Sequence, residues 1–278
     1  DFDNNKIGTI KYDANGMKLW EKTYYEINHT LVGQQLVNVN DKIYVSGIYY
    51  DLNIFTEGSI LLSYNFDGEQ QWHQKTSDMY VQTVTLGIDS QARPVLVTLG
   101  ATTDFANLKV LISTYNPEGD LLDEKNHLRL NDGTEPVWAL ISLGSDINDN
   151  LFVTMSSQHA GKGYTYEVLK YTESGTLPEW ISLYENHGAG STVLDSGRAD
   201  SLGNTIVIGR NVEYYDDYSN SFNYFIMKQD SDSNIAWKNE VLSTVNPSLV
   251  HFKINSFDEI IVVSCELMQS SFTITKFS

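Results

Sequence analysis

The chain has 278 residues, of which 41% are hydrophobic, and it carries 36 acidic and 18 basic side chains. That hydrophobic fraction can bury a substantial core, so a wholly disordered chain is excluded. The formal net charge of −18 repels phosphate backbones, which excludes nucleic acid as the expected partner. The acids are scattered along the chain, as on a surface suited to solubility, and they also attract cations or basic partners.

Cysteine content and hydropathy exclude further classes of protein. The single cysteine, Cys265, leaves no internal disulfide and no cysteine-based zinc site. No apolar stretch approaches the length of a membrane-spanning helix, so we expect no membrane insertion. The chain starts at Asp1 without a signal-like segment, which we expect of a processed or trimmed protein.

A segment of about ten residues recurs along the chain and ends on tryptophan in four of its five copies. Its turn positions are 52, 51, 56 and 58 residues apart: Gly16, Gly68, Gly119, Gly175 and Ser233. Short polar turns repeat between these copies, each followed by an apolar run, at residues 38–42, 89–93, 146–150, 200–204 and 255–259. Two markers with one period predict a repeat architecture.

Each repeat resolves into four strands, called A to D. Residues 6–12 and 18–24 supply a C and a D strand, and the first full unit has strands at 34–39, 43–50, 59–66 and 70–75. Three more units follow, and residues 248–278 supply strands A, B and C. Tight hairpins join A to B and C to D, where aspartate or asparagine opens the turn and glycine accepts positive φ. The repeated tryptophan lies on strand D, where it covers the flank of its sheet.

This pattern predicts an all-β chain that forms a single β-propeller domain over residues 1–278. Its blades are four-stranded antiparallel sheets. The 21 strands favour five blades, with the N- and C-terminal strands closing the ring. One C strand is then left over, so a larger ring or a longer protein stays an alternative.

The repeat resembles that of the secreted bacterial β-propeller repeat proteins, known as SBBP repeats. The resemblance is carried by residues 7–20 and by residues 200–209, and it recurs in every unit. It implies a propeller in an exported or surface-attached bacterial protein, extracellular or else periplasmic, and it transfers no catalytic residue. The turn-plus-tryptophan spacing is also similar to quinoprotein propellers, but a single cysteine cannot form their vicinal disulfide.

The B–C connections differ in length and are rich in tyrosine, which suits a variable binding surface on a rigid scaffold. Tyrosine offers apolar area with a hydroxyl, and a neighbouring aspartate adds an acceptor, a pairing suited to a glycan or a protein. The alternative is that these tyrosines pack onto neighbouring loops. The candidate ligand-binding residues are Tyr49, Tyr50, Asp51, Tyr164, Tyr166, Tyr214, Tyr215, Asp216, Asp217 and Tyr218.

Catalytic and metal signals are weak. Asp195, beside Arg198 on a predicted inner strand, is the one weak catalytic candidate, and a structural ion pair is the favoured explanation of it. Asp216 and Asp217 with Glu213 could hold Ca²⁺, although solvated turn acids are favoured and no other cofactor is expected. Three histidines expected in D–A connections are interpreted as surface residues rather than a metal site: His29, His127 and His187.

Three functions follow from this pattern, and the sequence favours the first. The chain is expected to be a non-catalytic binding or adhesion module, secreted or on the cell surface, that recognises a glycan or a protein. The alternatives are a polysaccharide-active glycoside hydrolase with an axial carboxylate site, and a structural scaffold without its own ligand. The sequence contains no motif that requires an enzyme.

Overall fold

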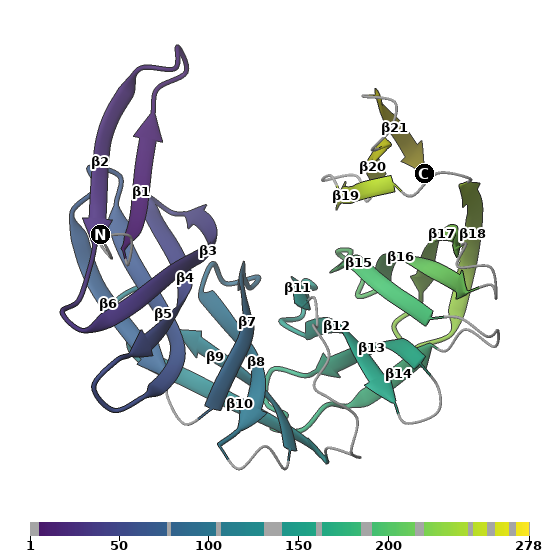
Figure 1. Ribbon diagram of the computed structural model, residues 1–278, viewed down its shortest axis with the longest axis horizontal. Coiled ribbons are helices and arrows are strands. Elements are labelled where there is room, and N and C mark those ends of the chain that lie inside the picture. Colours follow the sequence, from purple (N-terminus) through teal and green to yellow (C-terminus); the bar gives the residue numbers. More distant parts are fainter. Residues whose placement is uncertain are drawn as a thin grey trace. The chain divides into compact units, whose positions relative to one another are not determined.

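The computed structural model describes residues 6–76, 79–103, 107–130, 141–159, 163–184, 191–214, 220–243, 247–254, 259–266 and 271–277. These residues form strands and turns and contain no helix (Figure 1). Within these ranges, therefore, no helix offers the length and hydrophobicity that a membrane crossing needs. The chain divides into two compact units, residues 1–131 and residues 132–278.

Unit 1 contains a two-stranded ribbon and two four-stranded antiparallel sheets. The ribbon is β1 with β2, and the sheets have the orders β3-β4-β5-β6 and β10-β9-β8-β7. The strands are β1 (Ile7–Tyr12), β2 (Lys18–Tyr24), β3 (His29–Val39), β4 (Lys42–Asp51), β5 (Thr56–Asn65), β6 (Gln70–Thr76), β7 (Met79–Ile88), β8 (Pro94–Thr102), β9 (Asn107–Tyr115) and β10 (Leu121–Leu130).

Unit 2 contains two further four-stranded sheets, β11 to β14 and β15 to β18, and a three-stranded sheet, β19 to β21. The bounds are β11 (Ile141–Ser145), β12 (Leu151–His159), β13 (Gly163–Tyr171), β14 (Trp180–Tyr184), β15 (Ser191–Ala199), β16 (Thr205–Tyr214), β17 (Asn220–Gln229), β18 (Ile235–Ser243), β19 (Pro247–Ile254), β20 (Ile260–Glu266) and β21 (Ser271–Phe277). The predicted all-β class and the four-stranded antiparallel units are therefore confirmed, with the incomplete units at the predicted places.

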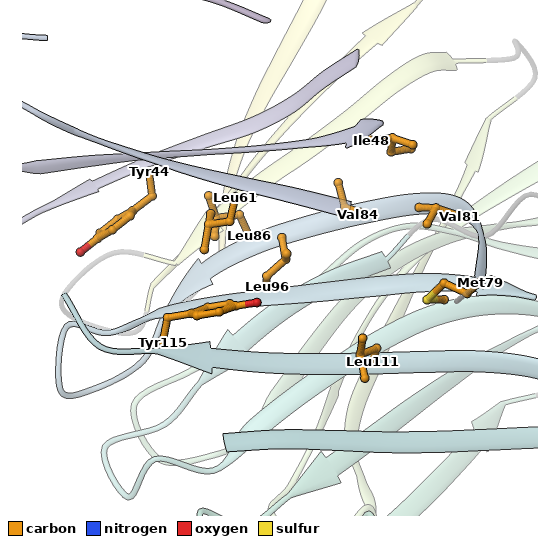
Figure 2. Close-up of a cluster of buried hydrophobic side chains, with 10 residues drawn as sticks. All are labelled: Tyr44, Ile48, Leu61, Met79, Val81, Val84, Leu86, Leu96, Leu111 and Tyr115. Atoms are coloured by element: carbon orange, nitrogen blue, oxygen red, sulfur yellow. The ribbon is translucent and has the colours of Figure 1, made fainter. Parts of the chain in front are cut away.

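The middle strands of the two four-stranded sheets of unit 1 are buried on both faces. In β4 seven consecutive residues are buried, and the same holds in β5, because sheets or strands pack on either side of them. One face joins a cluster that includes Ile7, Tyr24 and Tyr49, and the other joins a cluster that reaches the next sheet. Figure 2 shows this second cluster, in which Tyr44, Ile48 and Leu61 meet side chains of β7 to β9. Their full set is Tyr44, Ile48, Leu61, Met79, Val81, Val84, Leu86, Leu96, Leu111 and Tyr115.

The C–D hairpins close as the sequence predicts in four of the five repeats. Asp13 Oδ1 accepts hydrogen bonds from the backbone N–H groups of Asn15 and Met17, at 2.9 and 2.8 Å. The turn residues Gly16, Gly68, Gly119 and Ser233 all have positive φ. Gly175 does not, and the expectation of positive φ was wrong there, since the fourth copy has one extra residue and turns differently.

The tryptophans of strand D tie neighbouring sheets of unit 1 together. Trp20 Nε1 donates to the carbonyl of Phe66 at 2.9 Å, and Trp72 Nε1 donates to the carbonyl of Pro117 at 3.0 Å. The turn glycine of the next sheet lies against each ring, so closely that a Cβ on Gly68 or Gly119 would approach a ring carbon to 2.8 or 2.7 Å. The predicted role of tryptophan as a flank cover is therefore confirmed for these two copies.

Candidate functional site

The β4–β5 connection and the starts of β3 and β7 lie at one edge of the unit 1 sheets, which we call the loop edge (Figure 1). The tight A–B and C–D turns, such as those at Asp89 and Gly68, occupy the opposite edge. Within unit 1, therefore, the loops and the tight turns lie at opposite edges of the sheets.

The β4–β5 connection is a short turn organised by Asp51. Its Oδ1 accepts hydrogen bonds from the backbone N–H groups of Asn53 and Ile54, at 2.8 and 3.4 Å. The bond from Asn53 is the main cause that lowers the pKa of Asp51. The turn then passes through Phe55 at a φ of 55°, a left-handed conformation that is unusual for a bulky residue. Leu52, Ile54 and Phe55 are all exposed, and Phe55 is 85% exposed.

A small pocket opens at the loop edge between the two four-stranded sheets of unit 1. Its volume is about 80 Å³, and we call it the Glu57 pocket. It is lined by Phe55, Thr56, Glu57, Met79, Tyr80 and Thr103. These residues come from the β4–β5 hairpin, the start of β7 and the segment after β8, so the pocket exists only when the sheets pack together.

Glu57 is the ionisable group of this pocket. Burial of its carboxyl group raises the pKa of Glu57, and a hydrogen bond from the backbone N–H of Val81 offsets part of the effect. Tyr50 lies directly opposite Glu57 in the β4–β5 register. Burial, and after it the nearby Glu57 carboxylate, raises the pKa of Tyr50. Among the described residues no cationic side chain pairs with Glu57.

The opposite face of the same hairpin carries a second group of charged residues, which we call the Glu26 cluster: Glu26, His29, Asp51 and Lys75. Lys75 Nζ donates to Glu26 Oε2 and lies 4.6 Å from the centre of the Tyr49 ring. His29 Nε2 lies 3.5 Å from Glu26 Oε2 and 3.4 Å from Asp51 Oδ2. Its Nδ1 lies 2.9 Å from the carbonyl oxygen of Ile27.

Opposing effects act on Glu26 in this cluster. Desolvation by burial disfavours its carboxylate, but hydrogen bonds from Lys75 and Tyr24 outweigh that effect, so the pKa of Glu26 is lowered. Burial, followed by the hydrogen bond to Glu26, raises the pKa of the Tyr24 hydroxyl. Every acid of the cluster has a donor within the cluster or in the backbone, so the arrangement stabilises the loop edge and leaves no charge unpaired.

The structure separates the three candidate residues of the first B–C connection. Tyr49 is 6% exposed, and its hydroxyl donates to the carbonyl of Thr76 at 3.1 Å, so it packs in the core and is not presented to a ligand. Tyr50 is 37% exposed and faces the side of the Glu57 pocket. Asp51 caps its own turn and contacts His29. Of the three, Tyr50 alone has the exposure that a ligand contact needs.

Most of the remaining candidates cannot be assigned a side-chain role. Tyr164 and Tyr166 lie on β13, Tyr214 ends β16 and Glu213 precedes it, but their side chains lie outside the described residues. The rest lie wholly outside the described residues: Tyr215, Asp216, Asp217, Tyr218 and His187. The possible Ca²⁺ ligands therefore stay a prediction. Among the described residues, no group of three His, Cys, Asp or Glu side chains could hold a metal ion.

Asp195 lies at a bulge of β15, and its side chain is outside the described residues. The register of β15 shifts between Leu194 and Ser196, and matching shifts occur in β3, β7 and β19, around Gln34, Gln82 and Ser248. A bulge at the same place in four first strands is a property of the repeat. The bulge at Asp195 is therefore no evidence of a catalytic role.

His127 departs from its predicted place. It lies within β10, the D strand of its sheet, and not in a D–A connection, because β10 continues to Leu130. His29 begins β3 as part of the Glu26 cluster, and its side chain is partly buried.

No family model matches the chain, and no curated protein matches it. Among solved structures, the chain is similar to an endo-arabinase from Bacteroides thetaiotaomicron, with a TM-score of 0.48, 11% identity, and coverage of 86% of this chain and 90% of that one. It is similar to a levansucrase mutant from B. megaterium, with a TM-score of 0.46, 7% identity, and coverage of 99% and 85%. It is also similar to a mannose phosphorylase from Leishmania mexicana, with a TM-score of 0.44, 10% identity, and coverage of 91% and 85%.

All three names are those of carbohydrate-active enzymes. Scores below 0.5 at such low identity assign neither an activity nor a ring closure to this chain. What the chain shows on its own is an all-β fold of several small antiparallel sheets.

Proposed function

We propose that the chain is a non-catalytic recognition module, secreted or on the cell surface, that holds a protein or a glycan at the loop edge of unit 1. The observation that carries this proposal is the Glu57 pocket beside the exposed side chains of Leu52, Ile54 and Phe55. Exposed apolar residues next to a pocket that contains a carboxylate are typical of interaction sites, whereas isolated exposed residues are common everywhere.

The scaffold that we propose for this function is a five-bladed β-propeller. Four complete four-stranded sheets support it, together with a two-stranded ribbon at the start of the chain and a three-stranded sheet at its end. The strand roles in the incomplete sheets match C and D at the start and A, B and C at the end. A ring of this kind would hold its connecting loops on a rigid frame, as recognition requires.

Glycan and protein arrays test the recognition proposal. We expect the intact chain to bind a member of one array saturably, and replacement of Leu52 and Ile54 together by Ser to weaken that binding at least about tenfold. The matched control replaces Leu121 and Leu122 by Ser, because both are also exposed large apolar residues but follow the C–D turn at the opposite edge. Running each array with and without Ca²⁺ tests the calcium prediction at Glu213, Asp216 and Asp217.

Two results would contradict the recognition proposal. The first is the absence of saturable binding on either array, which would favour the scaffold hypothesis. The second is equal weakening by the loop-edge and the turn-edge variants, because binding would then depend on general surface hydrophobicity.

A glycoside hydrolase is the second candidate function. The observation that favours it is a pair of acids near one hairpin turn with opposite pKa shifts, raised for Glu57 and lowered for Asp51, as in the acid and base of such enzymes. However, residues paired across β4 and β5 share a face, so Glu57 lies on the face of Tyr50 while Asp51 lies on the other. The two carboxyl groups therefore do not face one substrate.

Release of reducing ends from a panel of polysaccharides tests the hydrolase hypothesis. Turnover that is lost in Asp195→Asn or in Glu57→Gln would establish it and would overturn the non-catalytic proposal. Saturable glycan binding without turnover would support recognition instead.

A further inference from the structure

The size of the Glu57 pocket limits what can enter it. At about 80 Å³ it is far below the roughly 300 Å³ or more of typical small-molecule sites. It has room for the end of one side chain or one functional group. A ligand that uses this pocket must therefore be anchored mainly by contacts outside it.

The lining combines apolar and aromatic surface with two threonines and one acid. Met79 is 2% exposed and contributes an apolar wall, while Phe55 and Tyr80 contribute aromatic rings and Glu57 contributes a carboxylate. Such a lining suits a group that combines a hydrocarbon stem with a positive charge. An ammonium group gains from a carboxylate and from aromatic faces at the same time.

Glu57 differs from two other buried acids, Asp89 and Asp200, in having no cation beside it among the described residues. Asp89 pairs with Arg93 at 2.5 Å, and Asp200 pairs with Lys228 at 2.8 Å. The pKa of Glu57 is raised by burial, so its charge is held at a cost in free energy. A ligand that supplies the missing cation would remove that cost.

The backbone at Phe55 gives an independent indication of function. A non-glycine residue in the left-handed region costs roughly 1–2 kcal/mol, and a bulky side chain is rarely found there. Here the strained residue is 85% exposed and lines the pocket, so the fold gains little buried area from it. Strain that persists without a packing benefit is typical of binding sites.

We infer that the Glu57 pocket binds the ammonium group of a lysine side chain on a basic protein partner. This inference rests on the proposed recognition function and names the class of its partner. A protein is favoured over a glycan because the pocket is small and Leu52, Ile54 and Phe55 beside it offer apolar contact area. The net charge of −18 attracts a basic partner over a long range.

Methyl NMR on the intact chain tests this inference, because Met79 lines the pocket. With methyl-¹³C methionine, we expect the Met79 resonance to shift saturably on addition of N-acetyl-lysine N-methylamide, and to shift at lower concentrations with an octamer of lysine. The resonance of Met17, an exposed residue of the β1–β2 hairpin turn, is the internal control. The corresponding norleucine compound, which keeps the stem and lacks the charge, should give no saturable shift.

Three variants test whether lysine binding depends on the Glu57 pocket. Glu57→Gln should weaken lysine binding at least about tenfold, while Glu21→Gln, the same change in an exposed pair with Lys18, should leave it within about twofold. Because each removes one charge from a net −18, general attraction is nearly equal in both. Phe55→Gly should fold normally, since glycine accepts the observed φ, and should weaken binding several-fold.

Failure of this inference is distinguishable from failure of the recognition proposal. Equal shifts with the norleucine compound, or equal binding by Glu57→Gln and wild type, would overturn the ammonium site. If the arrays identify a ligand while the lysine compounds leave Met79 unmoved, the ammonium site is wrong and recognition stands. If neither the arrays nor the lysine compounds show binding, both are overturned.

Discussion

The two faces of the β4–β5 hairpin hold acids in opposite situations. On one face, Glu26 and Asp51 receive hydrogen bonds from Lys75, Tyr24 and the turn backbone, and the pKa of each acid is lowered. On the other face, Glu57 receives one backbone hydrogen bond and no cation among the described residues, and its pKa is raised. The fold therefore uses Glu26 and Asp51 for its own stability, whereas Glu57 has no cationic partner among the described residues.

The alternation of a strand produces this difference between adjacent residues. Tyr49 points into the cluster of Ile7 and Tyr24, and Tyr50, one residue later, points to the side of Glu57. A ligand can therefore reach one face of the hairpin while the other stays packed. Substitutions on the two faces should therefore differ in their effects on stability.

Removing the two adjacent tyrosine rings should have very different consequences. Tyr49→Ala should lower the free energy of unfolding by about 3 kcal/mol or more, because a buried ring and its hydrogen bond to Thr76 are lost. Tyr50→Ala should lower it by less than about 1 kcal/mol. Urea denaturation measures both values, and equal losses would show that the division between the faces is wrong.

Removing the charge of Lys75 should lower the free energy of unfolding by an intermediate amount. Lys75→Met keeps the hydrocarbon stem against Tyr49 but removes the charge that pairs with Glu26, and should cost about 1–2 kcal/mol at neutral pH. Lys18→Met, the same change in the exposed pair with Glu21, is the control and should cost less than about 0.5 kcal/mol.

The loss of stability in Lys75→Met should depend on pH and should become smaller on acidification. The folded-state pKa of Glu26 is lowered, so its stabilising contribution is present above the ordinary value of 4.5 and is lost as the pH falls through the folded value. The difference between wild type and Lys75→Met should therefore shrink on acidification below that range. A difference that stays constant to low pH would show that Lys75 acts only through packing on Tyr49.

The sequence predicts the sheets well and the site poorly, for physical reasons. Turn residues and strand alternation are local, so the strands predicted at 43–50, 59–66 and 70–75 lie within three residues of their true bounds. The strand predicted at 34–39 ends correctly, but β3 begins five residues earlier, at His29. Tyr49 and Tyr50 lie at the end of the strand predicted at 43–50, yet both were taken as ligand-binding candidates of the B–C connection, although successive residues of a strand face opposite sides. Applying the alternation of that strand to its last two residues would have separated them.

The Glu57 pocket lacks such a local signal. Met79 and Tyr80 begin a different sheet, and Thr103 follows β8, so no spacing in the sequence brings them to Glu57. The sequence also gives no signal for the left-handed φ of Phe55, because glycine or asparagine is the residue that usually occupies such a position. Packing of two sheets creates the site, and this packing is known only from the structure.

The smallest predicted effect is that of Glu57→Gln on the free energy of unfolding. Its sign distinguishes a carboxylate that serves a ligand from one that stabilises the fold. Glu57→Gln should raise the free energy of unfolding at pH 7, by less than about 1 kcal/mol, because Glu57 is partly exposed and solvent screens its charge. Since the folded-state pKa of Glu57 is raised, its protonated form stabilises the fold, and that stabilisation is lost as the pH rises through the folded value. The advantage of Gln should therefore vanish below the ordinary pKa of 4.5. Urea denaturation at pH 7 and at pH 4 measures it, and Glu21→Gln should show no gain at either pH. A loss of stability in Glu57→Gln at pH 7 would mean that the carboxylate already has a stabilising partner and needs no ligand.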